Sequence, residues 1–283
     1  MSYWLISTVV LIVSALPLAL HYKAKKLKAR EVVLIALMAA LTVVANLICA
    51  FTIPLHLGTS LVILSGIGLG AQAGLLIGVL ARFICNFFMG QGMWTPWQML
   101  AWGLLGALGG IAFAKVEVIG HLSDKKKVLK ENVNTGIKAV LFPLVLVVFC
   151  ELIAFISYLF TRADNESFFG WRLYIFGFLG IILYVIFSRS KIPTNIITVT
   201  VFTFITVFVI YGGIMNFASM ITGSSYMGAG SESYISFETL KLMYITGVPY
   251  DFLHALFASI CSFLIGDSVI QKLERIKIKF GMY

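Results

Sequence analysis

The chain has 283 residues, of which 60% are hydrophobic and only 12% are charged. An average soluble domain carries about twice that share of charged residues, so the composition excludes an ordinary water-soluble fold. The net charge is +9, but the lysines and arginines stand in short clusters beside apolar runs. A basic face interleaved with aromatic residues is not visible, so we expect no nucleic-acid partner.

Apolar runs of roughly 20 residues, long enough to cross a bilayer as helices, recur along the chain. The first covers residues 3–20, has no positive charge before it and is followed by five between 23 and 30. A signal peptide carries its charge in front, so we expect an uncleaved helix there. The stretch 59–90 is too long for one span, and the glycines of 66–74 predict a tight turn between helices at 59–69 and 71–89. Further spans are expected at 31–50, 96–114, 138–160, 172–188, 194–215 and 238–266.

The sequence therefore predicts an all-α polytopic membrane bundle of about nine transmembrane helices. Of the 21 lysines and arginines, 17 fall in the segments 23–30, 115–138, 189–191 and 272–279, which the alternation of spans places on one side. Because positive residues concentrate in cytoplasmic loops, we predict a multi-pass membrane protein with its N-terminus outside and its C-terminus cytoplasmic.

Motifs of enzymatic chemistry are missing from the sequence. There is no G-x-x-x-x-G-K-[ST], H-E-x-x-H, C-x-x-C or G-x-S-x-G, and the four cysteines stand far apart in apolar surroundings. We expect no catalytic residue, no metal site and no cofactor. Glu151 stands alone on its predicted helix, and we expect it to have a paired structural role.

Small residues recur at a spacing of four, which lets membrane helices approach closely. Such a pattern indicates either internal packing or a docking surface for another membrane subunit. The residues are Gly66, Gly70, Gly74 and Gly78, then Gly106 and Gly110, and also Ala36 and Ala40.

Polar residues at membrane depth are costly unless they are paired or solvated. Arg82 and Asn86 share one helix face, and Asp251 and His254 follow Pro249, which we expect to begin a helix. One interpretation is a structural pair of Arg82 with Asp251, and the other is a polar wall of a ligand cavity.

The stretch GQGMWTPWQM, residues 90–99, is predicted to be a loop and the start of the next helix, with Thr95 as its cap. Trp94 and Trp97 suit an aromatic belt at the membrane interface. A belt does not explain Gln91 and Gln98, however. Aromatic faces with a few amides are typical of a pocket for a flat, polar organic molecule.

Three blocks of the chain resemble the substrate-binding S components of energy-coupling factor (ECF) vitamin transporters. They are REVVLIALMAALTVVAN (30–46), the segment 61–110 with its W-T-P-W-Q-M, and the region from IYGGIMNF (210–217) through YITGVPYDFLHALF to LERIKIKFG (273–281). The resemblance implies a six-helix core in the plasma membrane of a prokaryotic cell, which works with a transmembrane scaffold (T) subunit and two ATPase subunits. It also implies that Ala36 and Ala40 dock on the scaffold and that the loop 49–58 closes over the substrate.

The chain departs from that family by an extra N-terminal helix in 1–29 and by a helix pair inserted at 138–188, between core segments 30–137 and 189–283. Its expected function is vitamin capture, with cobalamin or a related corrinoid as the leading substrate and another vitamin or a modified nucleobase as the alternative. An ion-coupled secondary transporter and a non-transporting membrane scaffold are the alternatives. The predicted substrate-binding residues are His56, Arg82, Asn86, Gln91, Trp94, Thr95, Trp97, Gln98, Asn216, Asp251 and His254.

Overall fold

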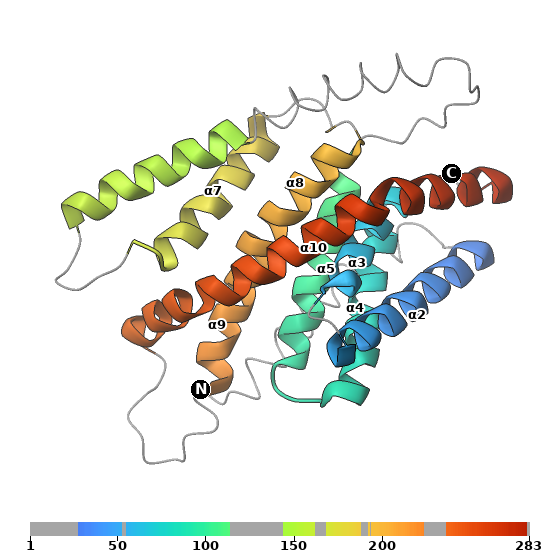
Figure 1. Cartoon of the computed structure of the whole chain (residues 1–283), viewed down its shortest axis with the longest axis horizontal. Coiled ribbons are helices and arrows are strands. Elements are labelled where there is room, and N and C mark those ends of the chain that lie inside the picture. The colour runs from blue at the N-terminus through green and yellow to red at the C-terminus, as the bar shows by residue number, and fades with distance from the viewer. Residues whose placement is uncertain are drawn as a thin grey trace.

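The computed structural model describes residues 28–52, 55–113, 144–161, 168–187, 192, 194–223 and 236–281. All regular elements within these ranges are helices (Figure 1). They are α2 (Ala29–Thr52), α3 (Leu57–Leu69), α4 (Ala71–Met89), α5 (Thr95–Ala112), the helix Leu144–Thr161, α7 (Trp171–Phe187), α8 (Ile196–Thr206), the π-helical η2 (Val207–Tyr211), α9 (Gly212–Gly223) and α10 (Phe237–Phe280).

This architecture confirms the all-α prediction. Eight of the nine predicted spans correspond to helices, because α8, η2 and α9 run on as the single span Ile196–Gly223. The predicted span 3–20 lies outside the described residues. The helix Leu144–Thr161 and α7 form the predicted pair, and they lie together at one side of the bundle (Figure 1). A Cβ placed on Gly180 of α7 would lie 2.8 Å from the Cα of Val147.

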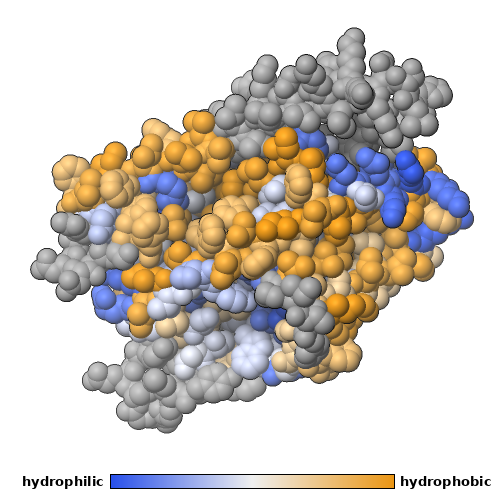
Figure 2. Space-filling model, in the orientation of Figure 1, coloured by the Kyte–Doolittle hydropathy of each residue, from blue (hydrophilic) through white to orange (hydrophobic). Residues whose placement is uncertain are grey.

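The surface of the bundle is that of a membrane protein. Five of the described helices are long and apolar enough to cross a bilayer, and hydrophobic side chains cover most of the face in Figure 2. Hydrophilic residues gather where α10 ends. There Lys28 Nζ donates to the carbonyl of Gly281 (3.3 Å) and Arg30 to that of Phe280 (3.2 Å). Lys28 and Arg30 therefore lie beside the basic end of α10, as expected if both belong to the same side of the membrane.

Glycines set the spacing of α3, α4 and α5. A Cβ on Gly66 would lie 1.9 Å from the carbonyl oxygen of Gly106, and one on Gly110 would lie 2.1 Å from the amide nitrogen of Ala71. No side chain fits at such distances, so these glycines are internal packing positions. Gly70 separates α3 from α4 with a φ of 98°, a conformation that glycine adopts without strain. This confirms the predicted turn.

The prediction that Pro249 begins a helix is wrong, because Pro249 lies inside α10. The helix begins twelve residues earlier at Phe237, where the Ser236 hydroxyl accepts a hydrogen bond from the Thr239 amide (3.1 Å). Proline removes only one backbone hydrogen bond, a loss that helices within a membrane bundle tolerate. A capped apolar segment ahead of it is sufficient to keep the helix continuous.

Candidate functional site

The end of α4 and the start of α5 are joined by side-chain hydrogen bonds. Gln98 Oε1 accepts from Arg82 Nε (2.9 Å) and from Asn86 Nδ2 (2.9 Å), and Asn86 Nδ2 also donates to Thr95 Oγ1 (3.0 Å). Arg82 and Asn86 lie one turn apart on α4, while Thr95 and Gln98 occupy the first turn of α5. The loop between the helices reverses the chain, so the structure brings these four predicted residues together.

Thr95 is the first residue of α5 and does not cap it, which corrects the prediction. The N-cap position is Trp94, whose side chain makes no capping hydrogen bond. The Thr95 hydroxyl is instead used within the loop, where it donates to Gln91 Oε1 (2.9 Å) and accepts from the Gly92 amide (3.2 Å). Gln91 is exposed and also donates to the carbonyl of Phe83 (3.2 Å). Gln91 and Thr95 thus order the loop.

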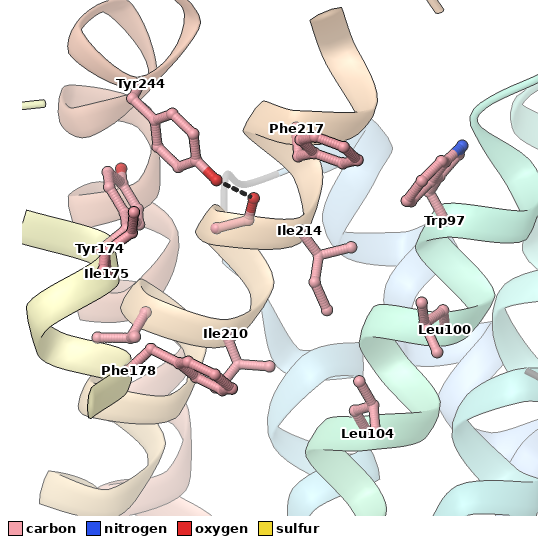
Figure 3. Close-up of a pocket in the computed structure, with 12 residues that line it drawn as sticks. Trp97, Leu100, Leu104, Tyr174, Ile175, Phe178, Ile210, Ile214, Phe217 and Tyr244 are labelled. Carbon is pink, nitrogen blue, oxygen red and sulfur yellow. Dashed lines mark hydrogen bonds between the residues drawn. The ribbon is translucent and has the colours of Figure 1, made fainter. Parts of the chain in front are cut away.

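Trp97 points into the protein, since only 6% of it is exposed. An interface belt therefore does not explain this residue. It lines a cavity of about 440 Å³, which we call the lateral cavity, and its ring lies 5.7 Å from that of Phe217 (Figure 3). The residues of the lateral cavity are Trp97, Leu100, Leu104, Tyr174, Ile175, Phe178, Val209, Ile210, Gly213, Ile214, Phe217 and Tyr244.

Arg82 is a buried cation, 8% exposed, without a carboxylate partner in the described part of the chain. Its guanidinium lies over the ring of Trp102, 5.2 Å from the ring centroid. The proposed structural pair of Arg82 with Asp251 is therefore wrong. A buried charge at membrane depth is costly when only a neutral amide and an aromatic face offset it, so Arg82 is a strong candidate for contact with a ligand.

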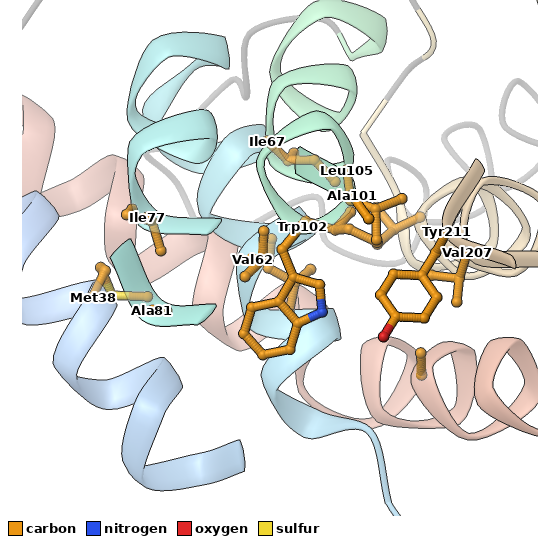
Figure 4. Close-up of a cluster of buried hydrophobic side chains, with 14 of the residues drawn as sticks. Met38, Val62, Ile67, Ile77, Ala81, Ala101, Trp102, Leu105, Val207 and Tyr211 are labelled. Atoms are coloured by element: carbon orange, nitrogen blue, oxygen red, sulfur yellow. The ribbon is translucent and has the colours of Figure 1, made fainter. Parts of the chain in front are cut away.

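Two histidines from distant parts of the sequence stack beside Arg82. The ring of His56, just ahead of α3, lies 3.8 Å from that of His254 of α10, and Thr59 Oγ1 lies 3.0 Å from His254 Nε2. The edge of Tyr211 packs on His254 at 4.4 Å. Trp102 and Tyr211 face one another across the core (Figure 4), which joins the histidines to the α4–α5 network.

We call this assembly the Arg82 cluster. It draws side chains from α3, α4, α5, η2 and α10 and from the loop that precedes α3. Its members are His56, Thr59, Arg82, Asn86, Gln98, Trp102, Tyr211 and His254.

Several buried polar atoms of the Arg82 cluster lack a hydrogen-bond partner among the described residues. They are Asn86 Oδ1, Trp102 Nε1 and His254 Nδ1. Buried polar atoms are almost always hydrogen-bonded, and leaving one unpaired costs about 1–3 kcal/mol. One acceptor, one indole donor and one imidazole nitrogen around a cation indicate that a polar molecule completes this cluster.

Burial, together with the positive charge of Arg82, lowers the pKa of His56 from 6.5 to about 4. The folded chain therefore keeps His56 neutral at pH values where the unfolded chain is protonated. The unfolded state binds the extra proton, so the free energy of unfolding falls as the pH drops from about 6.5 to about 4. We expect thermal unfolding measured across this range to show a smaller pH dependence for His56→Asn than for the natural chain. An unchanged pH profile would contradict the buried position of His56.

Asp251 belongs to a separate group, although it lies only three residues before His254. Its Oδ2 accepts hydrogen bonds from the hydroxyl of Tyr174 and from Asn216 Nδ2 (2.7 Å). A Cβ on Gly212 would lie 2.6 Å from Asp251 Cγ, so this glycine gives the carboxylate its room. The structure thus separates Asn216 and Asp251 from the other predicted site residues and assigns them to the junction of α7, α9 and α10.

The sequence analysis missed several residues that carry no motif of their own, namely Thr59, Trp102, Tyr174 and Tyr211. Trp102 was recognisable in principle, because it lies four residues after Gln98 on the same face of α5. Glu151 Oε2 is buried without a hydrogen-bond partner among the described residues, and the paired role expected for Glu151 stays a prediction. Within those residues, no group of three or more His, Cys, Asp and Glu side chains is placed to hold a metal ion.

Residues 26–161 match the family described as ECF-type riboflavin transporter, S component. The match covers just under half of the 283 residues and confirms the resemblance predicted from the sequence. It includes α2 to α5, and therefore Arg82, Asn86 and Gln98, and it ends with the helix Leu144–Thr161. No curated protein and no solved structure matches the chain.

Proposed function

We propose that this chain, an S component of the ECF type, captures riboflavin or a close relative at the membrane and delivers it to a transmembrane scaffold. Two ATPase partners would supply the ATP hydrolysis, for which the chain has no motif of its own. The observation that carries the proposal is the Arg82 cluster, a buried cation surrounded by aromatic rings and unpaired polar atoms within the family-matched region.

The chemistry of the Arg82 cluster complements a flat heteroaromatic ring with carbonyl groups. The pyrimidine edge of riboflavin presents two carbonyl oxygens on either side of an N–H. The Arg82 guanidinium and Trp102 Nε1 are donors for such oxygens, and Asn86 Oδ1 is an acceptor for such an N–H. The rings of Trp102, Tyr211 and His254 supply faces for stacking.

The loop ahead of α3 is the cover of this site. His56 stacks on His254 at 3.8 Å, which is the position that a ligand ring stacked on His254 would take. Binding would thus displace His56 and move the loop. The family resemblance implies a closing role for 49–58, but α2 extends to Thr52 and α3 begins at Leu57, so the connecting loop is shorter than expected. Residues 53 and 54 of this loop lie outside the described residues.

Cobalamin, the leading substrate expected from the sequence, is the second candidate. A corrinoid is several times larger than a flavin ring. The side chains of the Arg82 cluster already hydrogen-bond one another at 2.9–3.0 Å, so a corrinoid would require a far wider opening. This favours riboflavin.

Ala36 and Ala40 are both exposed on α2, where they form a shallow stripe between large apolar side chains. Leu37 is 62% exposed and Leu41 is 50% exposed. Small residues permit the close helix contact by which membrane subunits associate. We assign this face to docking on the scaffold subunit.

The direct test is a titration of the purified chain in detergent with riboflavin. Binding is measured as the quenching of riboflavin fluorescence. We expect saturable one-to-one binding that an excess of cobalamin does not displace. Binding of cobalamin with no binding of riboflavin would overturn the assignment of the substrate. If no vitamin of a broad panel binds or raises the melting temperature, the capture function itself is wrong.

A further inference from the structure

The lateral cavity is not explained by vitamin capture. It lies between α5 on one side and α7 on the other, and residues of η2 and α9 form its floor (Figure 3). Ile210 and Ile214 of that floor point into the cavity, whereas Tyr211, the neighbour of Ile210, packs on His254 of the Arg82 cluster. The lateral cavity and the Arg82 cluster therefore lie on different faces of the same helical segment.

The lateral cavity presents almost no hydrogen-bonding group to a polar ligand. Trp97 Nε1 has no hydrogen-bond partner among the described residues, but it lies at the end of the indole ring that points away from the other lining side chains (Figure 3). No charged residue lines it, and the hydroxyls of its two tyrosines are engaged. Tyr174 donates to Asp251, and Tyr244 donates to the carbonyl of Gly213 (3.0 Å). A polar molecule that entered would lose its hydration without compensation. The occupant must therefore be apolar.

The walls of the lateral cavity continue into the outer apolar surface of the bundle. Ile175 is 52% exposed, Phe178 is 49% exposed and Phe217 is 38% exposed, and all three also line the cavity. Phe217 belongs to a helix long and apolar enough to cross a bilayer, and Ile175 and Phe178 belong to a shorter apolar helix. We therefore infer that the medium beside this opening is the hydrocarbon of the bilayer. The volume of about 440 Å³ lies within the ~300–1,000 Å³ of ordinary small-ligand sites.

We propose that the lateral cavity binds one acyl chain of a membrane phospholipid, which fills the space between α5 and α7. The aromatic side chains of Trp97, Phe178 and Phe217 pack against the acyl chain. These contacts supply the dispersion attraction that the same side chains would lack beside an empty space. The lipid thereby supports α7 against the rest of the bundle. This proposal is independent of which vitamin the Arg82 cluster binds.

Trp97 makes the site observable, because bromine atoms on an acyl chain quench the fluorescence of a tryptophan that they contact. The full-length chain is placed in phosphatidylcholine vesicles with brominated or ordinary acyl chains. The contribution of Trp97 is obtained by subtracting the emission of Trp97→Phe. We expect the brominated chains to reduce this contribution at least twofold.

Gly213→Leu is the matched variant that fills the lateral cavity. A Cβ at this position meets only Tyr174, at 3.8 Å. Because Gly213 lines the cavity, we expect the longer side chain to extend into this space. We expect it to restore most of the Trp97 emission in brominated vesicles and to reduce the phospholipid that native mass spectrometry finds on the purified chain. Equal Trp97 emission in both kinds of vesicle would overturn the proposal, and so would quenching that Gly213→Leu leaves unchanged.

Discussion

Replacing Arg82 by methionine is expected to weaken riboflavin binding by about 100-fold or more. Loss of one partner of a buried, hydrogen-bonded charged contact typically costs about 2–5 kcal/mol of binding free energy. Methionine keeps an unbranched side chain and a high helix propensity, so α4 is preserved. The measurement is the same fluorescence titration, made on Arg82→Met and on the natural chain.

The stability of Arg82→Met distinguishes a ligand role from a structural role. Arg82 has no carboxylate partner among the described residues and is 8% exposed, so its removal relieves a desolvated charge. We therefore expect an unchanged or higher melting temperature in the absence of ligand. Lys241→Met is the control, because Lys241 pairs with Glu238 at 3.2 Å, away from the cluster, and should leave the affinity unchanged. Tight riboflavin binding by Arg82→Met would remove the Arg82 cluster from the site.

Among the substitutions considered for this protein, Asp251→Ala is expected to lower the free energy of unfolding the most. The carboxylate is 2% exposed and accepts hydrogen bonds from Tyr174 and Asn216. Removing it leaves two buried donors unpaired, at about 1–3 kcal/mol each, so the free energy of unfolding should fall by roughly 2–6 kcal/mol. Reversible denaturation in mild detergent measures this change.

A double-mutant cycle identifies the partner of Asp251. Tyr174→Phe removes one of its two donors, so the double variant should be less destabilised than the sum of the single variants. Additive effects would contradict the contact between α7 and α10. Riboflavin affinity at temperatures where Asp251→Ala is folded should stay within about threefold, since Asp251 lies outside the Arg82 cluster.

The sequence predicted the site only in part, and the reason is geometric. Asp251 and His254 are three residues apart, which places them near one face of a helix. Yet that face of α10 meets different neighbours at the two positions. Asp251 turns towards α7 and α9, and His254 turns towards α3 and η2. Spacing along one helix defines a direction, but it does not say which helix lies there.

Trp97 and Gln98 show the same limit on α5. Adjacent residues on a helix point about 100° apart, so the quoted loop motif divides between two places. Gln98 joins Arg82 in the polar cluster, and Trp97 enters the lateral cavity. One amphipathic stretch, interpreted as a single pocket wall, thus contributes to two sites.

What the sequence by itself determined was the membrane setting, the number of the described spans, the turn at Gly70 and the family resemblance. These follow from local properties, namely the length of apolar runs, the conformational freedom of glycine and the clustering of charge. The partners of the buried polar groups were decided by tertiary structure alone. Arg82 meets Gln98 and Trp102, and Asp251 meets Tyr174, because glycine contacts bring particular helices close together. Such pairings depend on how helices pack, and no single segment of the sequence contains that information.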